Sequence, residues 1–188
     1  MCFGGGVKGK PMISKSHLVL SAAFILALIG CASVSARPSS LTVASVPLDH
    51  YSGTWLEIAR RPMMLTNGCV AGYTTYRPGN KPGAILVEDG CHSQTPDGKT
   101  KTIKGPAELL DAGSTNAKLR VHYPFFITWE YWVLYEAPDH SWFISADPTM
   151  KNLWIYARKV PATDERAVMV AKAQDLGYDT SKLEFPAF

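Results

Sequence analysis

The sequence has no excess of charge of one sign once its first thirty residues are set aside. The 188 residues include 19 Lys and Arg against 16 Asp and Glu. Three of the basic residues, Lys8, Lys10 and Lys15, precede Cys31 and no acidic residue does, so the two signs balance in the rest of the chain. A neutral chain with scattered charges lacks the basic surface that nucleic-acid binding requires. We therefore expect no nucleic-acid partner.

Motifs of common enzymes are also missing. There is no Gly-x-Ser-x-Gly, no phosphate-binding loop and no carboxylate pair that the sequence places in one site. His50, His122 and His140 are isolated and lack the spacing of metal ligands. His92 follows Cys91, but neighbouring residues of a strand point to opposite faces, which argues against a thiol–imidazole pair. The sequence predicts a binding protein without cofactor or metal, and not an enzyme.

Long apolar runs are missing except for one near the N-terminus, from Leu18 to Ile29. A basic start before such a run predicts a secretory signal peptide over residues 1–30, because the run is too short for a stable membrane-spanning helix. Leu-Ile-Gly-Cys, ending at Cys31, resembles the lipobox of bacterial lipoproteins, in which this cysteine becomes the lipidated first residue. The alternative is cleavage after Ser-Val-Ser-Ala, at Ala36.

The rest of the chain divides into a tether and one domain. Residues 31–48 are rich in Ser, Ala, Val and Pro and are predicted to be the lipidated N-terminus and its tether. Residues 49–188 are enough for one domain with a real core and too few for two.

Cysteine is scarce, with four in the whole chain. Cys2 leaves with the signal and Cys31 is assigned to lipid, so Cys69 and Cys91 remain, and in an exported chain they favour a disulfide. A turn at Pro-Gly-Asn-Lys-Pro-Gly would pair strand residues whose numbers sum to 160 or 161, which places the two cysteines nearly opposite each other. The alternative is two buried thiols.

Short strands separated by turn residues make up most of the domain. "AKLRVHY" has a clear period of two, and the connections hold Pro, Gly, Asn or Asp. The predicted strands are 54–61, 69–77, 84–92, 100–109, 117–123, 129–136, 141–146 and 152–159. Even spacing and short connections predict an all-β fold, an eight-stranded antiparallel up-and-down β-barrel.

One C-terminal helix is predicted outside the barrel. Thr163 is a suitable N-cap, acidic residues follow it, and Gly177 ends the segment. Its predicted buried stripe consists of Ala167, Val168, Val170, Ala171 and Leu176.

Trp55 and Arg158 are predicted to meet at the closed end of the barrel. An arginine in the apolar run "LWIYARKVP" needs an acceptor or an aromatic face, and a guanidinium over an indole contributes about 0.5–2 kcal/mol. The first and last strands of a closed barrel are neighbours, so Arg158 can cover Trp55. Gly53 would let the chain turn tightly into the barrel floor.

Three stretches resemble the conserved regions of lipocalins, in order along the chain. "YSGTWLEIARRP" resembles the Gly-x-Trp region, "WEYWVLYEAPDHSW" the second, with Glu130-Tyr131 in place of Asp-Tyr, and "LWIYARKVP" the third, which ends in the Arg that covers the Trp. The chain is most similar to the bacterial outer-membrane lipoprotein lipocalins, which are similar to apolipoprotein D. The resemblance runs from about Val46 to Phe185.

The resemblance implies a carrier of a small hydrophobic ligand, a fatty acid or a lysophospholipid, held in the barrel cavity. It also implies a protein anchored by lipid in the outer membrane of a bacterium and facing the periplasm, and it leaves a homodimer open. The residues predicted to line the cavity are those on the faces of Trp55 and Arg158 or on similar strand faces: Glu57, Tyr76, Tyr131, Val133, Tyr135, Trp154 and Tyr156. For the aromatic residues the alternative is that they only fill a core, and for Glu57 it is a register break that leaves the carboxylate in solvent.

Two other functions remain open from the sequence. One is a lipocalin enzyme, an isomerase or peroxidase-like protein that uses Cys69 or Cys91 as a reactive thiol. The other is a structural envelope lipoprotein whose barrel is filled and binds no ligand.

Overall fold

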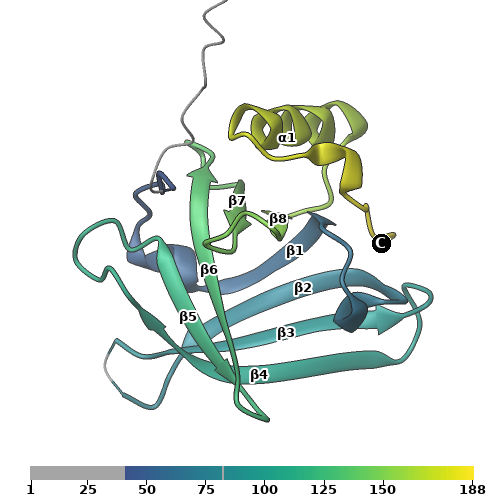
Figure 1. The fold of residues 1–188 in the computed structure, drawn as a ribbon. Coiled ribbons are helices and arrows are strands. Elements are labelled where there is room, and N and C mark those ends of the chain that lie inside the picture. Colours follow the sequence, from purple (N-terminus) through teal and green to yellow (C-terminus); the bar gives the residue numbers. More distant parts are fainter. Residues whose placement is uncertain (1–40, 82) are drawn as a thin grey trace, which may run out of the picture. The chain divides into compact units, whose positions relative to one another are not determined.

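Eight antiparallel strands form a closed barrel in the computed structural model, which describes residues 41–81 and 83–188 (Figure 1). The predicted signal peptide, Cys31 and most of the tether lie outside the described residues. Each strand pairs with its neighbour in sequence, and the first pairs with the last. The strands are β1 Gly53–Arg60, β2 Cys69–Pro78, β3 Ile85–Ser93, β4 Thr100–Leu109, β5 Lys118–Tyr123, β6 Ile127–Glu136, β7 Trp142–Ala146 and β8 Leu153–Ala157.

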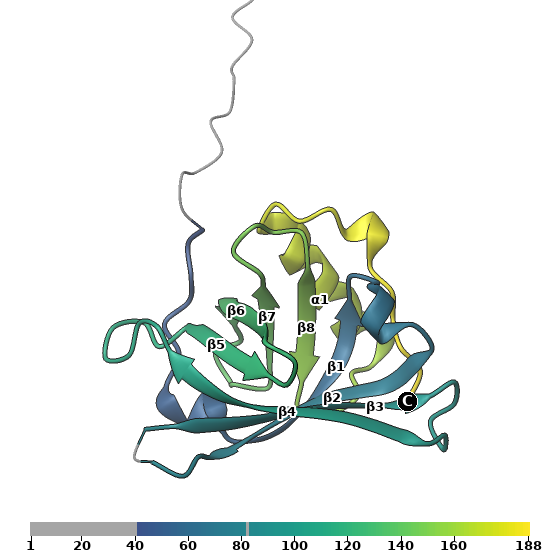
Figure 2. The same cartoon turned by 60° about the horizontal axis from the view of Figure 1, so that its bottom comes forward.

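These strands confirm the predicted fold class and all eight predicted strands, with bounds that differ by at most two residues. In Figure 2, β2, β3 and β4 form one curved wall, and the other strands complete the barrel. Three short 3₁₀ helices accompany them: η1 Leu48–Tyr51, η2 Met64–Thr66 and η3 Thr180–Lys182. Since η1 precedes β1 and η2 follows it, the two helices lie at opposite ends of the barrel. We call the end at η1 the floor and the end at η2 the mouth.

Helix α1, Thr163–Asp175, packs on the outside of the barrel. Its N-cap is Ala162 rather than the predicted Thr163, and the Ala162 backbone N–H donates to Glu165 Oε2 at 2.8 Å. The predicted stripe is right for Val170 and Leu176, which are partly buried against the barrel, but the fully buried residues are Met169 and Ala173, and Val168 is 62% exposed. The two fully buried residues, four apart on one face of the helix, are enough to pack it against the barrel, because the wall itself supplies large side chains, Ile144 and Ile155.

A disulfide joins Cys69 and Cys91, as predicted, with their Cα atoms 5.4 Å apart. The predicted register is wrong: Cys69 pairs with Ser93, and a bulge between Val70 and Tyr73 changes the sum of paired residue numbers from 162 to 163. The bond therefore links β2 and β3 diagonally. The loop it closes spans 22 residues, and such a constraint contributes about 3 kcal/mol in the chain-entropy account.

No helix among the residues from 41 onward that the structure describes is long and apolar enough to cross a membrane.

Candidate functional site

The floor of the barrel is closed by Trp55, which is fully buried, and by the rings around it. We call this set the floor cluster, and its members are His50, Tyr51, Trp55, Tyr76 and Phe143. The Trp55 Nε1–H donates to the His50 carbonyl at 3.1 Å. These rings contact one another edge to face or tilted, with centroids 4.5–6.4 Å apart, so they leave little space at this end.

Arg158 covers Trp55 from outside, where the sequence predicted it. Its Cζ lies 3.4 Å from the centroid of the indole ring. Its Nη1 donates to the carbonyls of Ser52 at 2.9 Å and Thr54 at 3.1 Å. Gly53, between these two residues, has φ +66°, and a Cβ there would lie 3.5 Å from Arg158 Nη1. The glycine is needed because this backbone conformation is costly for other residues.

His50 of the floor cluster also belongs to a buried polar pair with Glu136, which the sequence did not predict. His50 Nδ1 is 2.8 Å from Glu136 Oε1, and His140 Nδ1 is 3.3 Å from Oε2 of the same carboxylate. Burial would raise the pKa of Glu136, but the hydrogen bonds and charges of the two histidines outweigh it and lower the pKa. His50 looked isolated because its partner is 86 residues away in sequence.

At the middle of β3, the carboxylate of Asp89 lies inside the barrel. The hydroxyls of Thr74 and Tyr123 donate to its two oxygens, and the Tyr123 and Tyr131 hydroxyls are 3.2 Å apart. Burial raises the pKa of Asp89, although the two hydrogen bonds oppose the rise. Asp89 was not among the predicted cavity residues. The available signal was its place on the face of Ile85, Val87 and Cys91, which alternate along the strand.

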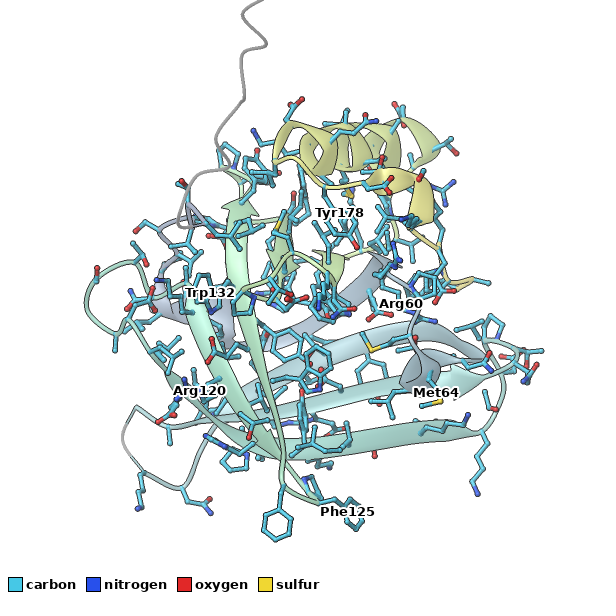
Figure 3. All side chains as sticks on the ribbon, viewed as in Figure 1. Arg60, Met64, Arg120, Phe125, Trp132 and Tyr178 are labelled. Carbon is cyan, nitrogen blue, oxygen red and sulfur yellow. A yellow bond between two sulfur atoms is a disulfide. The ribbon has the colours of Figure 1, made fainter. Side chains whose placement is uncertain are left out.

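A second interior carboxylate, Glu57, is neutralised by Arg60 on the same strand. Arg60 is 2% exposed and its Nη1 donates to Glu57 Oε1, while its Nε donates to Glu184 Oε1 at 2.5 Å. Its Nη2 donates to the carbonyls of Thr66 and Cys69. Figure 3 shows Arg60 between β1 and the C-terminal segment. The alternative in which Glu57 is solvated is wrong, since it is 8% exposed.

A bulge in β1 brings this pair together. The register with β8 shifts between Glu57 and Ala59, so Glu57 and Arg60 pair with Tyr156 and Trp154, which both belong to the interior core. Without the extra residue Arg60 would point outward.

Six of the seven predicted cavity residues belong to the barrel interior: Glu57, Tyr76, Tyr131, Val133, Trp154 and Tyr156. Tyr135 does not, and its prediction is wrong. A bulge between Val133 and Tyr135 shifts the register with β7, and Tyr135 packs outside against Trp142 with Lys172 of α1 over its ring.

The interior is filled at the floor and more open towards the mouth. On β6, Val133 is 3% exposed, whereas Ile127, Trp129 and Tyr131, which point to the same interior, are only partly buried. Asp89 is also partly exposed although it faces inward. Solvent therefore reaches these side chains through the mouth. The arrangement is a cup whose lower half is occupied by the floor cluster.

A separate cavity of about 540 Å³ lies beside the mouth. It is lined by the segment 62–70 after β1 and by the C-terminal segment 184–187, with Arg60 at its base. The last residues lie between β1 and β2: Glu184 pairs with Arg60, and the Ala71 N–H donates to the Ala187 carbonyl at 2.7 Å. Of the predicted cavity residues, none lines this space, so we assign the candidate ligand site to the barrel interior.

The chemistry of the site favours binding. The disulfide removes both thiols on which the enzyme alternative depends, and it shows that the alternative of two buried thiols is wrong. Among the described residues no group of His, Cys, Asp or Glu could hold a metal ion.

Comparison with known proteins agrees with this architecture. A family model described as a lipocalin-like domain matches residues 46–187. Temperature-induced lipocalin-1 of Arabidopsis thaliana is 36% identical over 151 residues, which cover 75% of this chain and 78% of that protein. Outer membrane lipoprotein Blc of Escherichia coli K12 is 28% identical over 169 residues, 88% of this chain and 92% of that protein.

Solved structures show the same fold. Insecticyanin of the tobacco hornworm Manduca sexta superposes with a TM-score of 0.62 at 22% identity, over 81% of this chain and 86% of that one. The family model, the sequence relatives, the closed eight-stranded barrel and its outer helix lead to one conclusion: the chain belongs to the lipocalin family, in the group that includes the bacterial Blc lipoproteins.

Proposed function

We propose that this lipocalin binds the acyl chain of a fatty acid or lysophospholipid inside its barrel and carries or stores it at the outer membrane of a bacterium. Lipocalins typically bind or transport small hydrophobic ligands. The observation that carries the proposal is the partly exposed apolar surface inside the mouth, from Ile127, Trp129 and Tyr131, above a closed floor. A filled structural barrel would leave no such surface.

Tryptophan fluorescence tests the binding. Titration with hexadecanoate is expected to quench the emission and to reach an end point at one ligand per chain. Affinity should fall about fourfold for each methylene removed from the ligand, because each buried methylene contributes about 0.8 kcal/mol. If hexadecanoate neither quenches the emission nor gives an end point, the result would favour the alternative of a structural envelope protein that binds no ligand.

Two tryptophans on opposite faces of the wall provide a matched control. Trp154 belongs to the interior core, whereas Trp142 packs outside against Tyr135. Trp154→Phe should remove much of the quenching and Trp142→Phe should leave it. Equal effects of the two substitutions would contradict binding in the barrel.

The membrane anchor is part of the proposal, and the relatives named Blc are outer membrane lipoproteins. In a bacterial host with two membranes, the wild-type chain is expected in the outer-membrane fraction with a lipidated N-terminal peptide in the mass spectrum. Cys31→Ala should release it to the soluble fraction, while Cys2→Ala should not. An unmodified N-terminus after Ala36 would contradict the anchor and support ordinary signal cleavage.

A further inference from the structure

The interior carboxylate of Asp89 has no cationic partner among the described residues. Thr74 and Tyr123 each donate one hydrogen bond to it. A carboxylate has about four acceptor positions, so one position on each oxygen is free. Asp89 faces inward and is still partly exposed, which means that the free positions are reached from inside the barrel.

The one arginine among the interior residues described above cannot compensate this charge. Arg60 is shared by Glu57 and Glu184, and its Nη2 donates to two backbone carbonyls, so its charge is already held by two carboxylates. The carboxylates of the barrel interior therefore outnumber its described cations. Burial raises the pKa of Tyr131 and Tyr156, and the negative charges of Asp89 and Glu57 add to the rise.

One polar atom of the barrel interior also lacks a hydrogen-bond partner among the described residues. Ser145 is 1% exposed and its Oγ has no hydrogen-bond partner. It pairs across the strands with Val133 and Trp154, which both belong to the interior core, so its side chain points into the barrel. The Trp154 ring lies 5.0 Å from the Tyr131 ring, and the Tyr131 hydroxyl reaches Tyr123 and through it Asp89. Ser145 and Asp89 thus face the same barrel interior, without a contact between them.

We propose that Asp89 selects a single-chain amphiphile whose polar end carries a protonated amine, and disfavours one that ends in a carboxylate. The ammonium group would occupy the free acceptor positions of Asp89, and the acyl chain would lie against Trp129, Tyr131 and Trp154. The unpaired carboxylate of Asp89 would repel a ligand carboxylate at the same place. The inference rests on the proposed function. It narrows the class of preferred ligands to amphiphiles that carry an amine, so a free fatty acid would be a weaker ligand.

Three probes with the same dodecyl hydrocarbon and different polar ends test whether Asp89 selects an amine: dodecylamine, dodecanol and dodecanoate. They compete for the site against an apolar fluorescent reporter at about pH 8, where the alkylamine stays protonated. The full chain is expected to bind the amine at least about tenfold more tightly than the carboxylate, with the alcohol between them. In Asp89→Asn the amine and the alcohol should bind alike.

Glu88→Gln is the matched control. Glu88 is the neighbour of Asp89, but it lies on the outer face and pairs with Arg77 and Lys104. Removing the same charge there should leave the ratio of amine to carboxylate affinity unchanged. Thr74→Val keeps the carboxylate and removes one donor, so it should keep the preference for the amine, and it covers the case in which Asp89→Asn does not fold.

The outcomes separate the two proposals. If no probe binds the wild-type chain, the proposed function fails and the selection fails with it. If the probes bind but the wild-type chain does not prefer the amine, or the preference survives in Asp89→Asn, the selection by Asp89 is overturned and the apolar binding site stands.

Discussion

Replacement of Trp55 by alanine is expected to lower the free energy of unfolding by about 3–5 kcal/mol, the range for a large buried ring. Trp55 is fully buried and contacts His50 and Phe143 at centroid distances of 5.3 and 4.8 Å. Its removal also takes away the face on which Arg158 lies and leaves the His50 carbonyl without its indole donor. A small residue cannot fill the space, because the surrounding rings are fixed by their own strands.

Urea denaturation followed by circular dichroism measures the change. Trp132→Ala is the control, because Trp132 is a partly buried tryptophan on the outer surface, with Lys118 over its ring, and its loss should cost clearly less. A double-mutant cycle of Trp55→Ala with Arg158→Ala should give a coupling of about 0.5–2 kcal/mol. A cost for Trp55→Ala no larger than that for Trp132→Ala would show that the indole does not close the floor.

The second large effect is expected from Arg60→Met, about 3–5 kcal/mol at neutral pH. The substitution keeps the apolar stem and leaves Glu57 buried without its cation. Burial already raises the pKa of Glu57 above its usual 4.5, with Arg60 opposing the rise. Without Arg60 the pKa of the folded state rises further, so the folded chain binds a proton more readily than the unfolded one. The destabilisation should therefore grow as the pH rises above about 4.5, while below it only the loss of the donors to the Thr66 and Cys69 carbonyls should remain.

Stability measured by urea denaturation between about pH 4 and pH 8 checks this dependence. Arg77→Met is the control, because Arg77 pairs with Glu88 at the surface and is about half exposed, and such pairs contribute about 0–1 kcal/mol. Glu57→Gln combined with Arg60→Met should recover part of the loss and flatten the pH dependence. A loss for Arg60→Met that does not change with pH would mean that Arg60 acts by packing alone.

The sequence predicted what short-range patterns determine. Turn residues and alternation locate all eight strands, and a charged residue in an apolar strand identifies the contact of Arg158 with Trp55. The bulges could not be predicted from the sequence, because an extra residue in one strand depends on how that strand fits its partner and leaves no clear local pattern. For this reason Tyr135 was placed inside and Arg60 was not considered.

The interior polar groups show a different limit. Asp89 stands on an apolar face of β3, and alternation alone could have indicated a carboxylate inside the barrel. Its partners could not be predicted, since Tyr123 is 34 residues away and belongs to another wall. His50 and Glu136 are the same case at the floor. When the barrel closes, it brings together residues that are far apart in the sequence, and the periodicity of the strands does not predict these contacts.

The seam between β1 and β2 near the mouth is completed by the chain's last residues. Glu184 pairs with Arg60 and Ala187 bonds to Ala71, so the wall has its final form only when the end of the chain is in place. Pairing of β1 with β8 has the same requirement. A chain that is synthesised N-terminus first cannot seal this barrel before residues 184–187 have emerged, and contacts of such long sequence separation are slow to form. Until these residues are in place the barrel stays unsealed, and this form is the one most exposed to aggregation and proteolysis.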